Sequence, residues 1–429
     1  MDAELARGRR RTLAVLWLTY ATFYLGRQNL AASLPALMAD TGLGEAAMGR
    51  VMSAFFLVYG VSQFINGVLG ERLSARWFIA VAMFVSAALN VAFGLASTFP
   101  AMAAIWALNA FFQSAGWCPI IKTIARWFPP GMRGRAGGVI TTSYQIGSVA
   151  AVGLTGLIVR QPGLGWRWAF FVPAALLAVT GVYALASIRD DPPYGGLGPP
   201  EHEPGAGAGR LSFLRAMGMT FTNGRLLVAA TVGCCVTAVA YGMQAWAPTY
   251  LNRVQGLAPD RAAWLSGVLP LATAAGMLLG GWASDNVFGG RRAPVVVLGS
   301  AAAAAVLLLA FVLPGTRVER LAGVLAAWAL VGLLMGAPQG VLASSVVMDF
   351  ARPGATATAM GFMGVCAYAG AALSAETAGR LVAAAHATPP AAQWVPVFAV
   401  WTATSAAAAL LMLPLWRAGH AGAPTPGGG

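Results

Sequence analysis

The feature that most constrains this chain is a series of twelve apolar runs, each long enough to cross a membrane. About 20 helical residues span the hydrocarbon core of a bilayer. We place the runs at about 12–36, 47–70, 77–98, 101–128, 134–158, 166–188, 225–252, 261–284, 293–314, 321–348, 355–379 and 393–416. The sequence therefore predicts an all-α membrane protein with twelve transmembrane helices, arranged as two six-helix bundles.

The composition supports lipid as the solvent of this chain. Only 10% of the 429 residues are charged and 58% are hydrophobic, whereas soluble proteins carry about a quarter charged residues. The net charge of +13 does not indicate nucleic-acid binding, because no basic stripe interleaved with aromatic residues is present. The partners we expect are the lipid bilayer and a small molecule.

The cysteines do not indicate a zinc-binding or disulfide-stabilised protein, and the first run does not read as a cleaved signal peptide. Cys118, Cys234, Cys235 and Cys366 lie in apolar runs without CxxC or Cys/His spacing, so neither a zinc site nor a disulfide framework is indicated. We expect no metal and no cofactor. The first run is too long for a signal-peptide core and is interpreted as a retained helix.

Composition also divides the chain. Residues 189–224 are rich in Pro, Gly and charged side chains, a composition that cannot bury apolar area, which predicts a flexible linker. We expect an N-terminal half at 1–188, a cytoplasmic linker at 189–224, a C-terminal half at 225–417 and a disordered tail at 418–429.

The arginines predict the orientation. With both termini cytoplasmic, 17 arginines fall on the cytoplasmic side and eight on the outer side, as the positive-inside rule requires. We expect a multi-pass protein of a bacterial-type inner membrane.

Two loops repeat one pattern of small residues, an acid and then basic residues. The residues concerned are Gly67, Glu71, Arg72 and Arg76 after the second run, and Asp285, Arg291 and Arg292 after the eighth. Glycines allow close helix approach, and the acids and arginines can pair at the cytoplasmic side. Ordinary positive-inside loops explain either copy alone, but both copies together resemble the loop pattern of the major facilitator superfamily.

Arg27 lies about 15 residues into the first run. A charge at that depth costs several kcal/mol unless it faces a cavity or a partner. Tyr20, Tyr24 and Arg27 share one helix face through i, i+4, i+7 spacing. Pairing with a buried carboxylate is the structural alternative, but Asp and Glu occur only in loops, tails or helix ends, so we interpret Arg27 as an anion-binding residue.

Lys122 is the only lysine. It lies toward the cytoplasmic end of the fourth run, where it either belongs to the anion path or its gate, or extends to the membrane interface.

No proton or sodium relay is evident. The three histidines lie outside the apolar runs, and Glu376 is four residues from Arg380, the spacing of a helical ion pair. Coupled carriers need an ionisable relay inside the membrane. A positive cavity without one favours an anionic substrate moved by exchange.

Neutral polar residues supply secondary candidates. Each could orient a substrate, and hydrogen bonding between helices explains each equally well. They are Tyr59, Gln63, Asn109, Gln113, Tyr144, Gln145, Tyr241, Gln244, Gln339 and Tyr368.

Several segments spread over nearly the whole chain share one resemblance. They include Tyr24-Leu-Gly-Arg-Gln-Asn, Val58-Tyr-Gly-Val-Ser-Gln-Phe, Asn109-Ala-Phe-Phe-Gln-Ser-Ala-Gly-Trp and Tyr241-Gly-Met-Gln-Ala-Trp-Ala-Pro-Thr-Tyr-Leu. Together these segments resemble the organophosphate:phosphate antiporter family of the major facilitators. The resemblance implies that Arg27 binds phosphate, that Lys122 occupies the family's basic position in helix 4, and that Tyr144 stands where the glycerol-3-phosphate carrier has histidine. It also implies a monomer.

Two positions depart from that family. Gln63 stands where lysine is usual, and Ala240 stands where the glycerol-3-phosphate carrier has a second phosphate-binding arginine. Two arginines suit a phosphate dianion. Either the substrate carries less charge, or Lys122 compensates.

The leading hypothesis is a secondary transporter that exchanges an organophosphate for inorganic phosphate by alternating access. The substrate-binding candidates are Arg27, Lys122, Tyr144, Tyr24, Gln63, Tyr241, Gln244 and Gln339. The alternatives are a carrier of an organic carboxylate or phosphonate, and a sugar-phosphate sensor of the same fold. An enzyme is not expected, because no HExxH or GxSxG motif lies on a helix.

Overall fold

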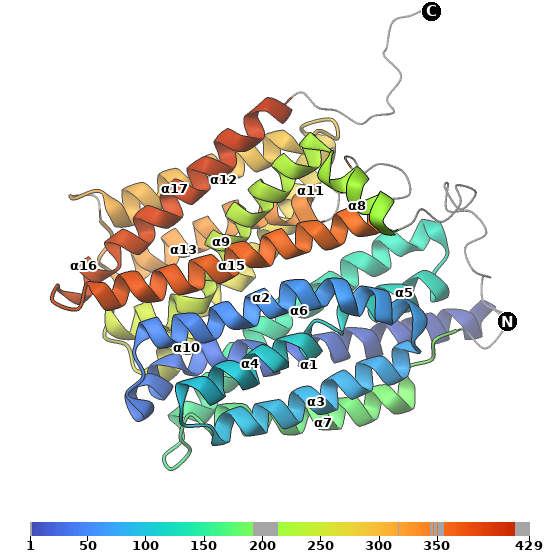
Figure 1. Ribbon diagram of the computed structural model, residues 1–429, viewed down its shortest axis with the longest axis horizontal. Coiled ribbons are helices and arrows are strands. Elements are labelled where there is room, and N and C mark those ends of the chain that lie inside the picture. Colours follow the sequence, from blue (N-terminus) through green and yellow to red (C-terminus); the bar gives the residue numbers. More distant parts are fainter. Residues whose placement is uncertain are drawn as a thin grey trace, which may run out of the picture. The chain divides into compact units, whose positions relative to one another are not determined.

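The computed structural model describes residues 2–191, 213–315, 317–343, 346, 350 and 356–416. These residues form helices and connecting loops, without a β-strand in any described range. The long helices can be followed in Figure 1. The first half contains α1 (Asp2–Thr41), α2 (Glu45–Arg72), α3 (Ala75–Leu95), α4 (Phe99–Gln113), α5 (Trp117–Trp127), α6 (Pro130–Arg160) and α7 (Trp168–Ser187).

The second half contains helices at the corresponding predicted runs. They are α9 (Gly224–Arg253), α10 (Pro259–Ser266), α11 (Val268–Asn286), α12 (Ala293–Leu307) with its π-helical end (Leu308–Val312), α13 (Leu321–Ala343), α15 (Thr356–Ala384), α16 (Pro390–Gln393), α17 (Val395–Met412) and a final 3₁₀ turn (Leu413–Leu415). The all-α prediction is confirmed.

Ten helical stretches of the described residues are long and apolar enough to cross a membrane. Two of the twelve predicted runs, 12–36 and 101–128, are not among these ten stretches, and the structure shows why. Arg27, Gln28 and Asn29 lower the hydropathy of α1, and run 101–128 is divided between α4 and α5. At this break Pro119 has no N–H to donate to the carbonyl of Ala115.

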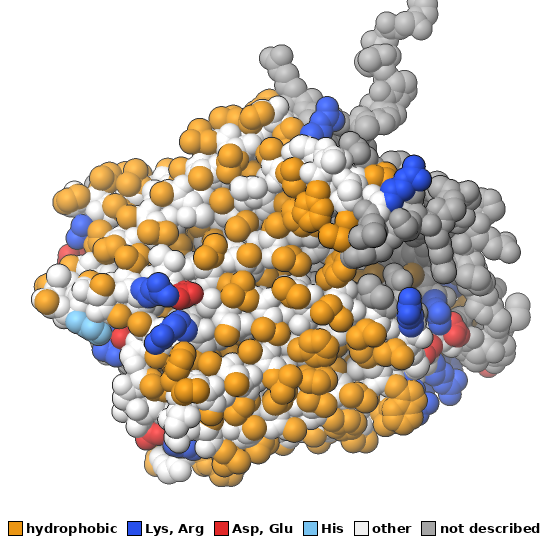
Figure 2. Space-filling view, in the orientation of Figure 1, with side chains coloured by type: hydrophobic (Ala, Val, Ile, Leu, Met, Phe, Trp, Pro, Cys, Tyr) orange, Lys and Arg blue, Asp and Glu red, His pale blue; other side chains and the backbone are white. Residues whose placement is uncertain are grey.

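The surface is that of a protein in lipid. Large apolar side chains such as Leu95, Val179 and Leu278 are exposed. On the face in Figure 2, hydrophobic side chains cover most of the helices, and charged side chains gather toward helix ends. Such an extensive apolar surface would associate in water, so the predicted lipid environment fits the exposed residues.

The contacts within the chain define two compact units. Unit 1 contains residues 1–206, 243–271 and 375–393, and unit 2 contains 207–242, 272–374 and 394–429. Unit 1 thus includes the later part of α9, all of α10 and the end of α15 beside the first half. The division into halves at 189–224 stays a prediction.

Part of the predicted linker is helical. Residues Phe213–Phe221 form α8, whose sequence FLRAMGMTF is more apolar than the rest of the segment. Just before the linker's undescribed part, Asp191 pairs with Arg126 at 3.0 Å. The predicted flexibility of residues 192–212, and the predicted tail at 418–429, lie outside the described residues.

Close helix packing in unit 2 depends on glycines. A Cβ added to Gly276 or Gly280 of α11 would lie 2.1 Å from the Leu333 carbonyl oxygen or 2.5 Å from the Ala337 Cα of α13. Gly336 of α13 meets the Thr273 carbonyl oxygen in the same way, at 2.3 Å. These backbones therefore touch directly, which is the small-residue packing of membrane helices.

Candidate functional site

Arg27 lies inside unit 1 with only 6% of its surface exposed. Its guanidinium carbon is 4.4 Å from the centre of the Tyr59 ring, 5.2 Å from that of Tyr24 and 5.5 Å from that of Phe55. Tyr59 and Phe55 are one helical turn apart on α2, so both face α1. Such cation–π contacts stabilise a guanidinium that has left water. Arg27 and Glu45 are the only charged side chains in the buried class among the described residues.

Aromatic side chains of α1, α5 and α6 form a cluster next to Arg27. Tyr24 stacks on Tyr144 of α6 with ring centres 5.8 Å apart, and Trp117 of α5 meets Tyr144 edge-on at 6.5 Å. Tyr20 lies 5.0 Å from Trp117. The structure therefore brings three predicted site residues, Tyr24, Arg27 and Tyr144, to one place.

A network of amides holds α1 directly beside Arg27. The side-chain Nδ2 atoms of Asn90 and Asn109 donate to the Gly26 carbonyl at 3.2 and 3.1 Å. Asn29 donates to Asn90 Oδ1 at 2.9 Å. A Cβ on Gly26 would lie 2.5 Å from Leu177, so glycine permits this approach.

Two secondary candidates belong to the same network. Ser86 donates to Asn109 Oδ1 at 2.7 Å, and Gln113 donates to Ser86 Oγ at 2.8 Å. Of the readings left open for Asn109 and Gln113, the structure favours hydrogen bonding between helices. Sequence reasoning missed Asn29 and Asn90 as members of this network, although both are polar residues within apolar runs.

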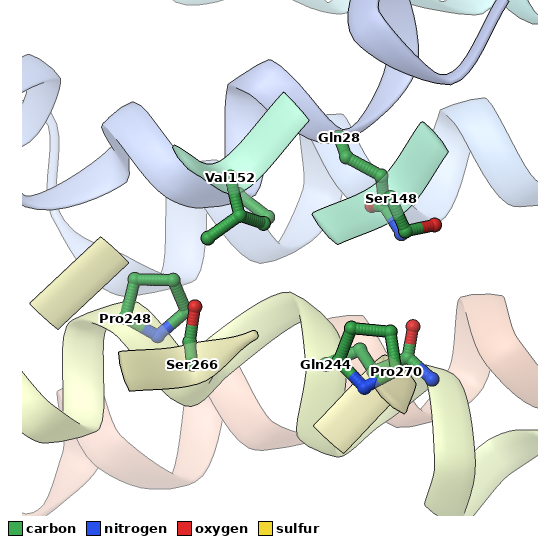
Figure 3. Close-up of a pocket in the computed structure, with 8 residues that line it drawn as sticks. Gln28, Ser148, Val152, Gln244, Pro248, Ser266 and Pro270 are labelled. Carbon is green, nitrogen blue, oxygen red and sulfur yellow. The ribbon is translucent and has the colours of Figure 1, made fainter. Parts of the chain in front are cut away.

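A narrow cleft lies in unit 1 next to this region. Gln28 of α1 and Ser148 and Val152 of α6 line one side, and Figure 3 shows Gln244, Pro248, Ser266 and Pro270 on the other. Ala31 completes the lining, and the empty space is about 270 Å³ including its open mouth. Gln244 was predicted. Gln28, Ser148 and Ser266 were not, although Ser148 follows Tyr144 by one helical turn.

Gln63 shares a face of α2 with Tyr59, four residues earlier. Its Oε1 atom is buried and accepts no hydrogen bond from any described residue. In unit 2, the Oε1 atom of Gln339 on α13 is in the same situation. Tyr241, also in unit 2, contacts Tyr368 edge-on at 5.9 Å. Gln339 and Tyr241 belong to unit 2 and Arg27 to unit 1, and the roles of Gln339 and Tyr241 stay predictions.

Lys122 of α5 lies against the C-terminal end of α2. Its Nζ atom donates to the carbonyl oxygens of Gly70 and Leu73 at 2.9 and 2.8 Å, where a cation complements the helix C-terminus. Gly70 is 11 residues beyond Tyr59, roughly 16 Å along a straight helix. The structure therefore does not bring Lys122 to Arg27, and its anion-binding role stays a prediction.

The C-terminal end of α2 packs on α5. A Cβ on Gly67 would lie 3.6 Å from Cys118 Sγ, and the Arg76 backbone N–H donates to Asp190 Oδ1 at 3.1 Å. Arg72 is exposed, and the Glu71 side chain lies outside the described residues.

The loop after α11 pairs within itself. Arg292 pairs with Asp285 and donates to Ser284 Oγ at 3.0 Å, and Arg291 donates to the Phe288 carbonyl at 3.1 Å. Asp285 and Arg292 therefore stabilise the loop to which both belong. The gating role of both loops stays a prediction.

These features define a polytopic membrane protein with a buried cationic site. The chain belongs to the Major Facilitator Superfamily, whose family model matches residues 16–375. It is a superfamily of transporters, so the chain is not an enzyme.

The relatives agree with the predicted resemblance. The chain is 27% identical to a probable hexose phosphate transport protein of Chlamydia trachomatis, over 96% of this chain and 91% of the relative. It is 29% identical to the glycerol-3-phosphate transporter of Bacillus subtilis, over 86% and 85%. It is 27% identical to the membrane sensor protein UhpC of Salmonella typhimurium, over 97% and 94%. These are the relatives expected of the organophosphate:phosphate antiporter family.

Among solved structures, a bacterial homolog of the human lysosomal transporter Spinster, in an inward-facing and occupied conformation, matches with a TM-score of 0.77. The two chains are 18% identical over 95% of this chain and 97% of that one. This likeness supports the fold alone.

Proposed function

We propose that the protein is a secondary transporter of an organophosphate, exchanged for inorganic phosphate. The observation that carries the proposal is Arg27, a buried arginine held among three aromatic rings in a chain related to sugar-phosphate and glycerol-3-phosphate carriers. A guanidinium presents N–H donors in a planar fork that suits phosphate oxygens.

In this mechanism Arg27 recognises the phosphate that both substrates share. A charge without a partner inside the membrane is costly. A bound anion that neutralises Arg27 therefore speeds the change between the inward-open and outward-open states, whereas the empty carrier makes this change slowly. Because only the loaded carrier changes state quickly, the protein exchanges one anion for another. The two halves would rock about the site, as in other transporters built from repeats.

The outer closure in this proposal lies at the end of α2 remote from Lys122. Glu45 is 2% exposed and pairs with Arg253 of α9 at 3.0 Å. Gly49 and Gly379 bring α2 and α15 into backbone contact, since an added Cβ would lie 2.8 Å from Ala375 O or 2.5 Å from Glu45 O. With both termini cytoplasmic, this end faces outward.

Uptake by proteoliposomes tests the proposal. Liposomes loaded with inorganic phosphate should take up labelled glycerol 3-phosphate or hexose 6-phosphate, and unloaded liposomes should not. Uptake of a dicarboxylate or a phosphonate, independent of internal phosphate, would contradict the exchange and favour the other anionic classes.

A sensor of sugar phosphate is the second candidate, and the observation that favours it is the likeness to UhpC over nearly the whole length of both chains. Binding of an organophosphate to the purified protein with no uptake in loaded liposomes would support the sensor. We further propose a monomer in a bacterial-type inner membrane.

A further inference from the structure

We infer that the short helix α10 is a lid over the outer end of the cleft. The indole ring of Trp264, seated on two glycines of α6, holds this lid shut, and a bend at Gly267 allows it to lift. The inference rests on the alternating access of the proposed function, but not on which anion is carried. The lid and all its contacts described below belong to unit 1.

The Trp264 ring lies directly on the backbone of α6. A Cβ added to Gly153 would lie 2.9 Å from Trp264 Cη2, and one added to Gly156 would lie 2.9 Å from Trp264 Cδ1. The Cβ on Gly156 would also lie 3.0 Å from the Asp260 carbonyl oxygen. Because Gly153 and Gly156 are three residues apart, they share one face of α6. The indole ring therefore fills a notch that any side chain at either position would occupy.

A buried apolar layer continues this contact across the end of the cleft. It consists of Ala32 of α1, Val152 of α6 and Ala263 of α10. Each of the three lies one helical turn beyond a polar residue of the cleft lining. Those polar residues are Gln28, Ser148 and Ser266, in the same order. With both termini cytoplasmic, α1 and α6 run outward and α10 runs inward, so the layer lies on the outer side of the cleft.

The joint between α10 and α11 can bend. Gly267 separates the two helices, and its N–H donates only three residues back, to Trp264 O at 3.2 Å. Pro270 has no N–H for the Ser266 carbonyl, so the regular helical hydrogen bonds are interrupted here. Helices kink at such positions. Unit 1 also ends in this part of the chain at Leu271, so α10 packs with α1 and α6 while most of α11 belongs to unit 2.

The contact between Trp264 and α6 suits a part that opens and closes. The Trp264 side chain is 49% exposed, so leaving the notch uncovers only part of the ring. A flat ring is either seated in such a notch or out of it, because packed surfaces do not deform continuously. Val152 and Ser266 face each other across the cleft (Figure 3). Lifting α10 would therefore separate the two walls at this end.

Cysteine labelling tests the lid without any substrate. In a cysteine-free background, Ser148→Cys places one thiol in the cleft, and an external, membrane-impermeant thiol reagent measures its access from outside. The test variants are Gly153→Ala, Trp264→Ala and the two combined. Gly138→Ala is the matched control, because it adds the same methyl group to the same helix at a position where an added Cβ meets nothing within 4 Å.

We expect Gly153→Ala to raise external labelling about tenfold, a shift of about 1.4 kcal/mol, because the added methyl group displaces the Trp264 ring. Trp264→Ala should raise labelling by a similar factor. The three atoms nearest to a Cβ on Gly153 all belong to Trp264. The two changes therefore act on one contact, and their combination should exceed either alone by less than about threefold. Gly138→Ala should leave labelling unchanged.

Labelling that stays at the wild-type rate in Trp264→Ala would overturn the inference. So would an equal rise in Gly138→Ala, or effects of the two test changes that multiply in full. Trp264→Ala adds no atoms, so it tests the lid even where Gly153→Ala lowers the yield of folded protein. A failure of the proposed function looks different: phosphate-loaded liposomes would show no exchange, while the labelling pattern would stand.

Discussion

At the scale of single residues, Arg27 is the clearest case of a charge whose surroundings fit a function. Its guanidinium faces the Tyr59 ring at 4.4 Å, and α1 is fixed beside it by the two amides on Gly26 O. Position and orientation are thus both determined by neighbouring helices, which is the preorganisation that a binding site needs.

The first prediction concerns the shape of this cation. Arg27→Lys keeps the charge but loses the planar fork and the flat contact with aromatic rings. We expect exchange of inorganic phosphate to fall at least tenfold, about 1.4 kcal/mol, measured in proteoliposomes. Arg50→Lys is the matched control, because Arg50 also faces an aromatic ring, Phe99 at 4.7 Å, but is exposed. Equal loss in both variants would contradict the role of Arg27.

Lys122 provides the second prediction. The Lys122 Nζ atom donates to Gly70 O and Leu73 O. Lys122→Met should therefore lower the free energy of unfolding in detergent by about 1 to 2 kcal/mol. The apparent affinity for phosphate should remain within about threefold of the wild type. A tenfold or greater loss of affinity without loss of stability would instead support the anion-path role implied by the family resemblance.

At the scale of helices, α11 and α13 depend on direct backbone contact. Gly280→Leu would force a side chain into the space occupied by Ala337, whose Cα lies 2.5 Å from an added Cβ. Overpacking of this kind costs about 1 to 3 kcal/mol or more, so we expect a large loss of folded protein in fluorescence-detected size-exclusion chromatography. Gly281→Leu is the control, since an added Cβ there meets nothing within 4 Å; similar losses would exclude close packing as the cause.

At the scale of the whole molecule, alternating access requires ends that close and open. The buried Glu45 carboxylate lies 3.0 Å from Arg253 and 3.8 Å from His386 Nε2, so residues of α2, of α9 and of the segment after α15 meet at one acid. Replacing one member of such a pair leaves the others without a counter-charge. The proposed outer closure should weaken accordingly.

The fourth prediction measures this closure. In a cysteine-free background with Val152→Cys in the cleft, Glu45→Gln should raise labelling by an external, membrane-impermeant thiol reagent about tenfold, for a shift of about 1.4 kcal/mol. Asp40→Asn is the control, because Asp40 pairs with Arg167 at 2.8 Å and joins first-half segments only. Labelling that does not change in Glu45→Gln would contradict the closure.

Sequence alone determined the helices and the central charge. A run of about 20 apolar residues has one stable form in lipid, because the backbone must satisfy its own hydrogen bonds. An arginine within such a run must face a protein interior. For this reason the positions of the helices and the burial of Arg27 inside the protein could be predicted from local pattern.

The tertiary structure decided which polar residues act on which partners. Asn109, Gln113 and Gln244 looked equivalent in the sequence. In the structure Asn109 bonds to Gly26 of α1 and Gln113 to Ser86 of α3, whereas Gln244 lines the cleft. Lys122 bonds to the end of α2. Helical periodicity gives the face of a residue within its own helix, whereas the neighbour opposite depends on how distant segments pack.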